Sequence, residues 1–140
     1  MEEYLKSADY IVKQLMYAED AFSQWLGIEI DFISQGSCRL SFVVKDDMLN
    51  GFGICHGGVL YSFADSALAF ASNSLGFQSF SIETHMSHVK KVALGDKLSA
   101  QATQKFVSER FGIYEVEIKN QHNDIVGLFK GTVYKSGKKW

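Results

Sequence analysis

One carboxylate in this sequence falls within an apolar segment. Asp65 lies in residues 58–75, which are otherwise rich in Val, Leu, Phe and Ala, on a narrow polar stripe with Ser62, Ser66, Ser72 and Asn73. A buried carboxylate without a partner is costly, so such a group is hydrogen-bonded, paired or exposed in a cavity. In a cavity it can accept a proton from water. Asp65 is therefore a candidate functional residue, and a structural residue bonded to Ser62, Ser66 or a neighbouring backbone group is the alternative.

Two glycines precede this segment, in the run Asn50-Gly51-Phe52-Gly53-Ile54-Cys55-His56-Gly57-Gly58. The first N–H groups of a helix lack partners within it, and together with the helix dipole they favour negative charge. A helix that begins at Gly57 and Gly58 can therefore hold an oxyanion. His56 and Asn50 could orient a bound molecule or close the loop. An ordinary loop-to-helix turn capped by His56 is the alternative.

Other catalytic motifs do not fit this sequence. Gly51 and Gly53 lack the third glycine of a dinucleotide-binding fingerprint, and neither a P-loop nor a GxSxG elbow occurs. His85 and His88 lie three residues apart in a predicted strand, so they point to opposite faces and do not easily share a metal ion. We therefore expect no metal site.

The spacing of apolar residues predicts the elements that must position these groups. Apolar residues three and four apart predict a helix over residues 4–25, ended by Gly27, and a central helix over 58–75. Alternation predicts strands over 28–34, 37–45, 79–89, 97–107, 111–119 and 125–134, the first two joined by a turn at Gln35-Gly36. Strands on both sides of one central helix indicate an α+β domain, with an antiparallel sheet wrapped on that helix. One sheet face should be dry, and the other wet or paired with another subunit.

Composition limits the class of protein. The 140 residues include 14 Lys+Arg and 16 Asp+Glu, a net charge of −2, which indicates one domain over 1–140 and no nucleic-acid partner. No apolar stretch reaches the ~18 residues of a membrane span, and the acidic N-terminus is unlike a secretory signal. We expect a cytoplasmic protein that does not bind membranes, with Cys38 and Cys55 as buried or half-buried free thiols.

The combined pattern resembles the helix signature of PaaI-type hotdog thioesterases, the phenylacetyl-CoA thioesterase group. The matching residues are Asn50, His56-Gly57-Gly58-Val59, Ala64-Asp65 and Asn73-Ser74-x-Gly76, and later Gly95-Asp96-x-Leu98 and Tyr114-Glu115-Val116-Glu117-Ile118. The similarity covers residues 10–135. It implies a hotdog fold, in which a curved antiparallel sheet wraps a central helix, and hydrolysis of acyl-CoA thioesters.

The resemblance also implies roles for individual residues. The carboxylate matching Asp65 acts as general base or as nucleophile, and the backbone N–H matching Gly57 polarises the thioester carbonyl. Asn50 and His56 support the site. Ser81 matches by position a residue that helps to position water.

The remaining assignments concern the substrate. Gly58 and Ser66 are expected to bind it. The sequence departs from the family at residues 86–91, where many members have an aromatic residue or Asp followed by proline. Lys90 and Lys91 could pair there with the phosphates of CoA, and a solvated strand end is the alternative. No cofactor is implied, because CoA is part of the substrate.

Three functions follow from this pattern. The first is a thioesterase for small aryl or medium-chain acyl-CoA, including phenylacetyl-CoA. The second is non-catalytic acyl-CoA binding, although a regulator would need a DNA-binding module that does not fit in 140 residues. The third is a hotdog dehydratase or hydratase, which the spacing of Asp65 from His56-Gly57-Gly58 disfavours.

Helix geometry predicts a shared site. Gly57 and Asp65 are eight residues apart in the sequence, or ~12 Å along one helix at 1.5 Å per residue. An oxyanion donor and a base must both reach one reacting centre, which a single helix does not allow. Two antiparallel copies would bring Gly57 of one chain to Asp65 of the other. We therefore expect a homodimer with shared sites, and the resemblance implies a homotetramer.

Overall fold

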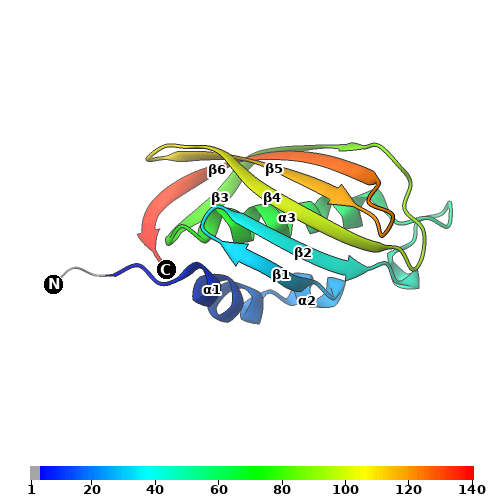
Figure 1. Ribbon diagram of the computed structural model, residues 1–140, viewed down its shortest axis with the longest axis horizontal. Helices are drawn as coiled ribbons and strands as arrows, with labels where there is room; N and C mark the ends of the chain where they lie inside the picture. The colour runs from blue at the N-terminus through cyan, green and yellow to red at the C-terminus, as the bar shows by residue number, and fades with distance from the viewer. Residues whose placement is uncertain (1–3) are drawn as a thin grey trace.

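The computed structural model of the protein describes residues 4–140. Short helical pieces lead into a hairpin and one long helix, and four strands follow (Figure 1). The elements are α1 Ala8–Tyr10, η1 Ile11–Met16, η2 Tyr17–Glu19, α2 Ala21–Leu26, β1 Glu29–Ser34, β2 Ser37–Val43, η3 Asp46–Met48, α3 Gly57–Asn73, β3 Phe77–His88, β4 Lys97–Val107, β5 Phe111–Lys119 and β6 Ile125–Lys139.

The predicted N-terminal helix is confirmed, but it does not run unbroken over residues 4–25. The segment consists of α1, the π-helix η1, the 3-10 helix η2 and α2, and the chain leaves helical geometry at Asp20 (φ −94°, ψ 85°). The Asp20 carboxylate accepts a hydrogen bond from the Ser23 N–H at 2.9 Å, so it caps α2 and starts a new helix there. Gly27 ends α2 as predicted, in the left-handed conformation (φ 74°) that glycine adopts without strain.

Six strands of the described chain form one antiparallel sheet in the order β1-β2-β4-β5-β6-β3. β4 and β5 have the predicted bounds, and β6 continues past its predicted end to Lys139. The sheet wraps α3, which confirms the hotdog arrangement (Figure 1). β3 lies at one edge of the sheet and β1 at the other.

The core lies between α3 and the inner face of the sheet. Phe63 of α3 packs edge-on against Phe42 of β2, with ring centroids 4.6 Å apart. Burying such a side chain stabilises the fold by about 1.5–3 kcal/mol. Alternate residues of β4 face α3 and are fully buried, whereas those between them are not; the buried set is Leu98, Ala100 and Ala102. This alternation confirms the prediction that one sheet face is dry.

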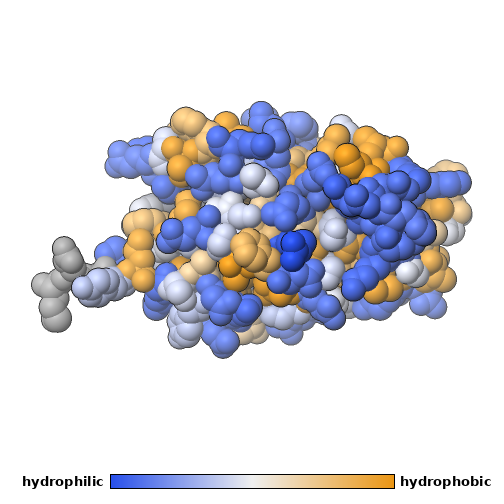
Figure 2. Space-filling model, in the orientation of Figure 1, coloured by the Kyte–Doolittle hydropathy of each residue, from blue (hydrophilic) through white to orange (hydrophobic). Residues whose placement is uncertain are grey.

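The outer surface is more polar. Figure 2 shows hydrophilic side chains over much of the face on which β2 and β4 lie in front of α3, with apolar groups scattered between them. None of the described helices is long and apolar enough to cross a membrane. Cys38 and Cys55 are buried free thiols, as predicted, and burial raises the pKa of Cys38 to about 12 and that of Cys55 to about 11. Neither is therefore a thiolate nucleophile at neutral pH.

Candidate functional site

His56 caps the N-terminus of α3. Its Nδ1 accepts a hydrogen bond from the N–H of Gly58 at 2.8 Å. A Cβ at position 58 would lie 2.9 Å from that nitrogen, so the cap requires glycine there. For the neighbouring N–H of Gly57, no acceptor is found among residues 4–140. The first turn of α3 therefore keeps one N–H free to donate to a bound molecule.

Asn50 organises the loop that leads to α3. Its Oδ1 accepts hydrogen bonds from the N–H of Phe52 at 2.9 Å and of Ile54 at 3.3 Å. Asparagine commonly closes turns in this way. Its amide Nδ2 has no acceptor in the part of the chain that is described, so it too can donate to a bound molecule.

Asp65 is exposed on α3 in the single chain. Its carboxylate forms no hydrogen bond or ion pair with any described residue. The alternative in which Ser62 or Ser66 holds it is not observed, because Ser62 donates to the carbonyl of Gly58 at 2.8 Å and Ser66 bonds to Ser23.

The environment of Asp65 makes it a stronger base than an ordinary aspartate. Its pKa is raised, first because neighbouring atoms displace part of the solvent around the carboxyl even though the side chain is exposed, and second because the Asp20 carboxylate repels its charge. A carboxylate with a raised pKa and no protein partner is typical of groups that accept protons in active sites.

The other end of the polar stripe is structural. The Asn73 side chain accepts hydrogen bonds from the Ser79 N–H at 2.9 Å and from the Trp140 indole N–H at 3.0 Å, and it donates to the Ser79 carbonyl at 3.1 Å. Asn73 and Ser72 are buried. In this stripe Asp65 is thus exposed, whereas Asn73 is buried and holds β3 and the C-terminal residue in place.

β3 runs back along α3 and brings further residues to it. The Tyr61 hydroxyl is hydrogen-bonded to Thr84, and the ring of His88 at the end of β3 lies against Gly57. Ser81 is exposed and lies between Thr84 and Ser79 on β3. Since Ser79 binds the end of α3, Ser81 lies beside the middle of that helix.

The two lysines after β3 differ in their surroundings. Lys90 Nζ lies 2.6 Å from Asp124 Oδ2 in an exposed ion pair, a kind of contact that contributes little to stability. Lys91 has no partner among residues 4–140. The next residue, Val92, accepts a hydrogen bond from the Cys55 N–H at 2.8 Å. This segment therefore passes beside the loop that leads into α3.

The single chain contains both parts of the predicted site without joining them. One group of predicted residues lies at or beside the N-terminus of α3: Asn50, His56, Gly57, Gly58 and Lys91. Asp65 and Ser66 lie two helical turns away from this group. Over ~12 Å of helix, Gly57 and Asp65 of one chain do not reach the same atom.

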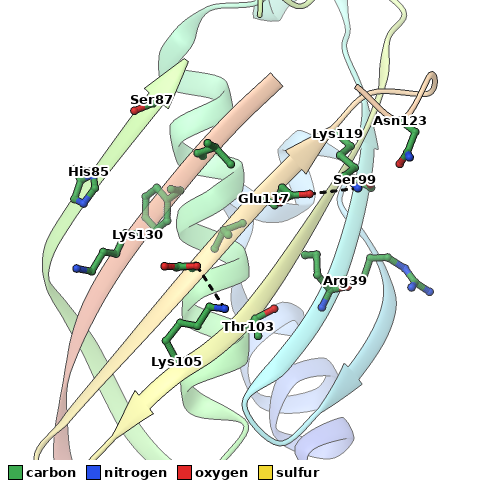
Figure 3. Close-up of a pocket in the computed structure, with 15 residues that line it drawn as sticks. Arg39, His85, Ser87, Ser99, Thr103, Lys105, Glu117, Lys119, Asn123 and Lys130 are labelled. Carbon is green, nitrogen blue, oxygen red and sulfur yellow. Dashed lines mark ion pairs between the residues drawn. The ribbon is translucent and has the colours of Figure 1, made fainter. Parts of the chain in front are cut away.

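A groove of about 640 Å³ lies on the other face of the sheet (Figure 3). It contains His85, whereas His88 contacts α3, so the two histidines point to opposite faces as predicted. Both glutamates of the groove are paired, Glu115 with Lys105 at 3.6 Å and Glu117 with Lys119 at 3.3 Å. The groove therefore offers no free carboxylate. No cluster of three His, Cys, Asp or Glu side chains suited to a metal ion occurs in residues 4–140.

Sequence reasoning missed two contacts near these residues. Asp20 bonds to Ser23, which bonds to Ser66 beside Asp65. The signal was present, because Asp20 three residues before Ser23 is a helix-capping pattern. The contact of His88 with Gly57 left no signal, since it depends on how β3 packs against α3.

Known proteins resemble this chain over most of its length. The profile of the Thioesterase superfamily matches residues 52–126. Acyl-coenzyme A thioesterase PaaI of Escherichia coli is 36% identical over 122 residues, which cover 87% of this chain and 87% of that protein. A protein of Archaeoglobus fulgidus is 37% identical over 124 residues, which cover 89% of this chain and 80% of that protein.

Solved structures show the same similarity. The E. coli PaaI protein from the phenylacetic acid degradation operon has a TM-score of 0.91 and 33% identity, over 94% of this chain and 96% of that chain. The TT0310 protein of Thermus thermophilus has a TM-score of 0.80 and 34% identity, over 83% of this chain and 97% of that chain.

Proposed function

This chain belongs to the thioesterase superfamily and is a thioester hydrolase, and we propose that it acts on acyl-CoA thioesters with small aryl or medium-chain acyl groups. Phenylacetyl-CoA is the first candidate, since the related E. coli protein is an acyl-coenzyme A thioesterase from the phenylacetic acid degradation operon. The products are the free acid and CoA, and no further cofactor is needed. The observation that carries the proposal is the unpartnered carboxylate of Asp65 with its raised pKa.

Asp65 is the proposed base. It accepts a proton from water while the water oxygen attacks the thioester carbonyl carbon. The C–S bond then breaks, its electron pair leaves with the CoA sulfur, and the proton held by Asp65 passes to that thiolate. In the alternative route the Asp65 carboxylate attacks the carbonyl, and water hydrolyses the resulting anhydride. A burst of CoA release in the first turnover would identify this second route.

The Gly57 N–H is the proposed donor to the oxyanion. It lies at the positive end of the α3 dipole and has no acceptor among the described residues. The adjacent N–H of Gly58 is occupied by His56. A donor of this kind contributes about 10²–10³ in kcat. We assign His56 to holding this turn, Asn50 to the loop and to donation through its free amide, and Gly58 to close contact with the substrate.

The remaining predicted residues are assigned to water and CoA. Ser81 is exposed beside the middle of α3, where it could position the attacking water. Lys91 has no partner in residues 4–140, and Lys90 forms an exposed ion pair with Asp124 that it can exchange for a phosphate. Both lysines could therefore bind the phosphates of CoA. The hydroxyl of Ser66 is already bonded to Ser23. Ser66 therefore supports α3 in this proposal and does not contact the substrate through that hydroxyl.

We propose that two chains share each active site. β3 is an edge strand whose Phe80 and Ile82 side chains are 58% and 59% exposed, and such an edge favours pairing with another strand. Antiparallel pairing of β3 with its copy makes the two α3 helices antiparallel as well. Tyr61 lies midway between Gly57 and Asp65 on α3, and its hydroxyl is hydrogen-bonded to Thr84 of β3. A two-fold axis that passes near Thr84 therefore sets Gly57 of one chain opposite Asp65 of the other.

A homotetramer and a cytoplasmic location complete the proposal. Phe22 and Trp25 of α2 pack together and remain 48% and 43% exposed, which provides a second apolar surface for association of dimers. The unpaired thiols Cys38 and Cys55 are typical of a reducing compartment.

A panel of acyl-CoA esters tests the proposed function. Free thiol release should be fastest for one of the aryl or medium-chain esters. Asp65→Asn keeps the size of the side chain and removes the base, so it should lower kcat at least ~10²-fold, the usual scale of general base catalysis. Hydrolysis by Asp65→Asn at the wild-type rate across the panel would contradict the mechanism.

A further inference from the structure

A buried chain of hydrogen bonds joins α2 to α3 beside Asp65. The Ser23 hydroxyl lies 2.6 Å from Oδ2 of Asp20 and 2.8 Å from the hydroxyl of Ser66. Ser23 is fully buried, and Ser66 is 8% exposed. Ser66 directly follows Asp65 in α3, so this chain anchors the turn of helix that carries the candidate base.

The direction of the chain follows from its chemistry. An ionised carboxylate only accepts hydrogen bonds, and a serine hydroxyl has one hydrogen to donate. Ser23 therefore donates its hydrogen to Asp20, and Ser66 donates to Ser23. Asp20 Oδ1 also accepts the Ser23 N–H at 2.9 Å. Together these three hydrogen bonds fix the Asp20 carboxylate against α3.

Within residues 4–140, Asp20 is the charged group whose field is found to act on Asp65. β2, β4, β5 and β6 present mostly apolar side chains to the helix, and the buried residues of η1 are Ile11 and Val12. β3 brings Thr84 to Tyr61 and the imidazole of His88 to Gly57, which lies two turns of α3 away from Asp65. Lys13 of η1 is paired with Asp9 at 2.7 Å. The pKa of the Asp65 carboxyl is raised first by the loss of surrounding solvent and second by the negative charge of Asp20 at the start of α2.

We propose that Asp20 is a positioning residue for the hydrolysis described above: through Ser23 and Ser66 it fixes the turn of α3 that carries Asp65, and its negative charge strengthens Asp65 as a proton acceptor. This inference rests on the proposed function. It also assigns a functional role to the break at Asp20 in the N-terminal helix, because in a continuous helix Asp20 would not cap α2 beside Ser23.

Asp20→Asn separates the charge from the hydrogen bonds. Asparagine is an equally good helix cap and can accept from Ser23 through its amide oxygen. With the charge removed, Asp65 becomes a weaker base. We expect kcat to fall about threefold to tenfold with KM unchanged, since general base catalysis follows basicity. The acid limb of the kcat profile should move to lower pH. Asp20→Ser, another uncharged cap, provides a second variant if Asp20→Asn folds poorly.

Ser23→Ala is the matched control. It breaks the chain and keeps the charge, so kcat should fall while the acid limb stays at its wild-type pH. An unchanged circular dichroism spectrum and a cooperative thermal transition above the assay temperature show that each variant is folded.

The proposal is overturned if Asp20→Asn and Asp20→Ser both keep the wild-type acid limb and kcat while Asp65→Asn is inactive. That result leaves the proposed function intact. Wild-type activity of Asp65→Asn would instead refute the proposed function itself, so the two failures are distinguishable.

Discussion

The imidazole of His88 lies against Gly57, so that a Cβ built at Gly57 would stand 3.3 Å from Cε1 and 3.6 Å from Nε2 of the ring. The end of β3 therefore covers one side of the first turn of α3. A larger residue at position 57 requires the ring to move by a few tenths of an ångström. Position 57 thus combines a free N–H with a Cα that has little room for a side chain.

This arrangement predicts different effects for two substitutions of Gly57. Gly57 is the first residue of α3, where proline is tolerated, and His56 before it has the extended geometry (φ −60°, ψ 133°) that proline requires. Gly57→Pro removes the N–H and should lower kcat about 10²–10³-fold. Gly57→Ala adds a Cβ but keeps the N–H, so its loss should be much smaller. Steady-state kinetics on folded variants measure both. Equal losses would show that crowding at His88, and not the missing donor, is responsible.

The fold could be predicted where the local pattern and the tertiary packing agree. β5 alternates along its whole length and β4 alternates from Leu98 to Ala102, and turn residues flank both strands, so the sequence predicts their bounds. The N-terminal segment differs, because its apolar spacing fits one helix while the Asp20 carboxylate binds the Ser23 N–H and interrupts it. Spacing alone does not reveal which of these two effects dominates.

The candidate site could be predicted only as separate residues. Asp65 and the two glycines are recognisable because of their types and their positions on a helix. The position of His88 against Gly57 depends on β3 returning along α3, and the link from Asp20 to Ser66 depends on α2 packing against the same helix. The contacts of His88 with Gly57 and of Ser23 with Ser66 arise from packing and leave no local pattern in the sequence, whereas the cap of Ser23 by Asp20 does.

Replacement of Asp65 should also change stability. The pKa of Asp65 is raised in the folded chain, so its ionised form is disfavoured there relative to the unfolded chain. The stability linked to this group is therefore complete below the ordinary aspartate pKa of ~3.9 and is lost as the pH rises through the folded-state pKa. Asp65→Asn should raise the thermal midpoint at about pH 7, and this gain should disappear at about pH 3.

Asp124 provides a control, because its replacement should change the thermal midpoint in the opposite direction. The pKa of its carboxyl is lowered by the Lys90 ammonium, so ionised Asp124 favours the folded chain. Asp124→Asn should therefore lower the thermal midpoint slightly at neutral pH. A lower midpoint for Asp65→Asn at neutral pH would show instead that the Asp65 carboxylate makes a stabilising contact in the assembled protein.

Mixing two inactive variants tests whether sites are shared. Asp65→Asn retains Gly57, and Gly57→Pro retains Asp65. Their heterodimer should contain one site with both groups and one site with neither. Random exchange makes half of the dimers mixed, so activity should recover to about one quarter of the wild-type value.

Each variant incubated alone under the same exchange conditions is the control. Differently tagged subunits show that mixed dimers have formed. Verified mixed dimers without activity would refute the shared site, as would a fully active monomer.

A cysteine at Thr84 tests where the two-fold axis lies. Tyr61 is midway between Gly57 and Asp65 on α3, and its hydroxyl is bonded to Thr84. An axis that pairs Gly57 with Asp65 of the other chain therefore passes close to Thr84. Directly opposed residues of antiparallel strands have Cβ atoms about 4.5–5.5 Å apart, close to the separation that a disulfide spans. Thr84→Cys should thus form a disulfide-linked dimer under mild oxidation, detected on a non-reducing gel.

Two further cysteine variants test whether the two-fold axis passes near Thr84. Ser99→Cys lies on β4, within the sheet and away from the β3 edge, and should stay unlinked. The native Cys38 and Cys55 are buried and should not compete.

Ile82→Cys tests the position of the axis. Ile82 lies two residues from Thr84 on the exposed edge strand, and an axis near Thr84 sets it opposite a residue further along the partner strand. Ile82→Cys should therefore form far less disulfide-linked dimer than Thr84→Cys. Preferential linking at Ile82 would move the axis along β3 and separate Gly57 from Asp65 of the other chain, which contradicts the shared-site geometry.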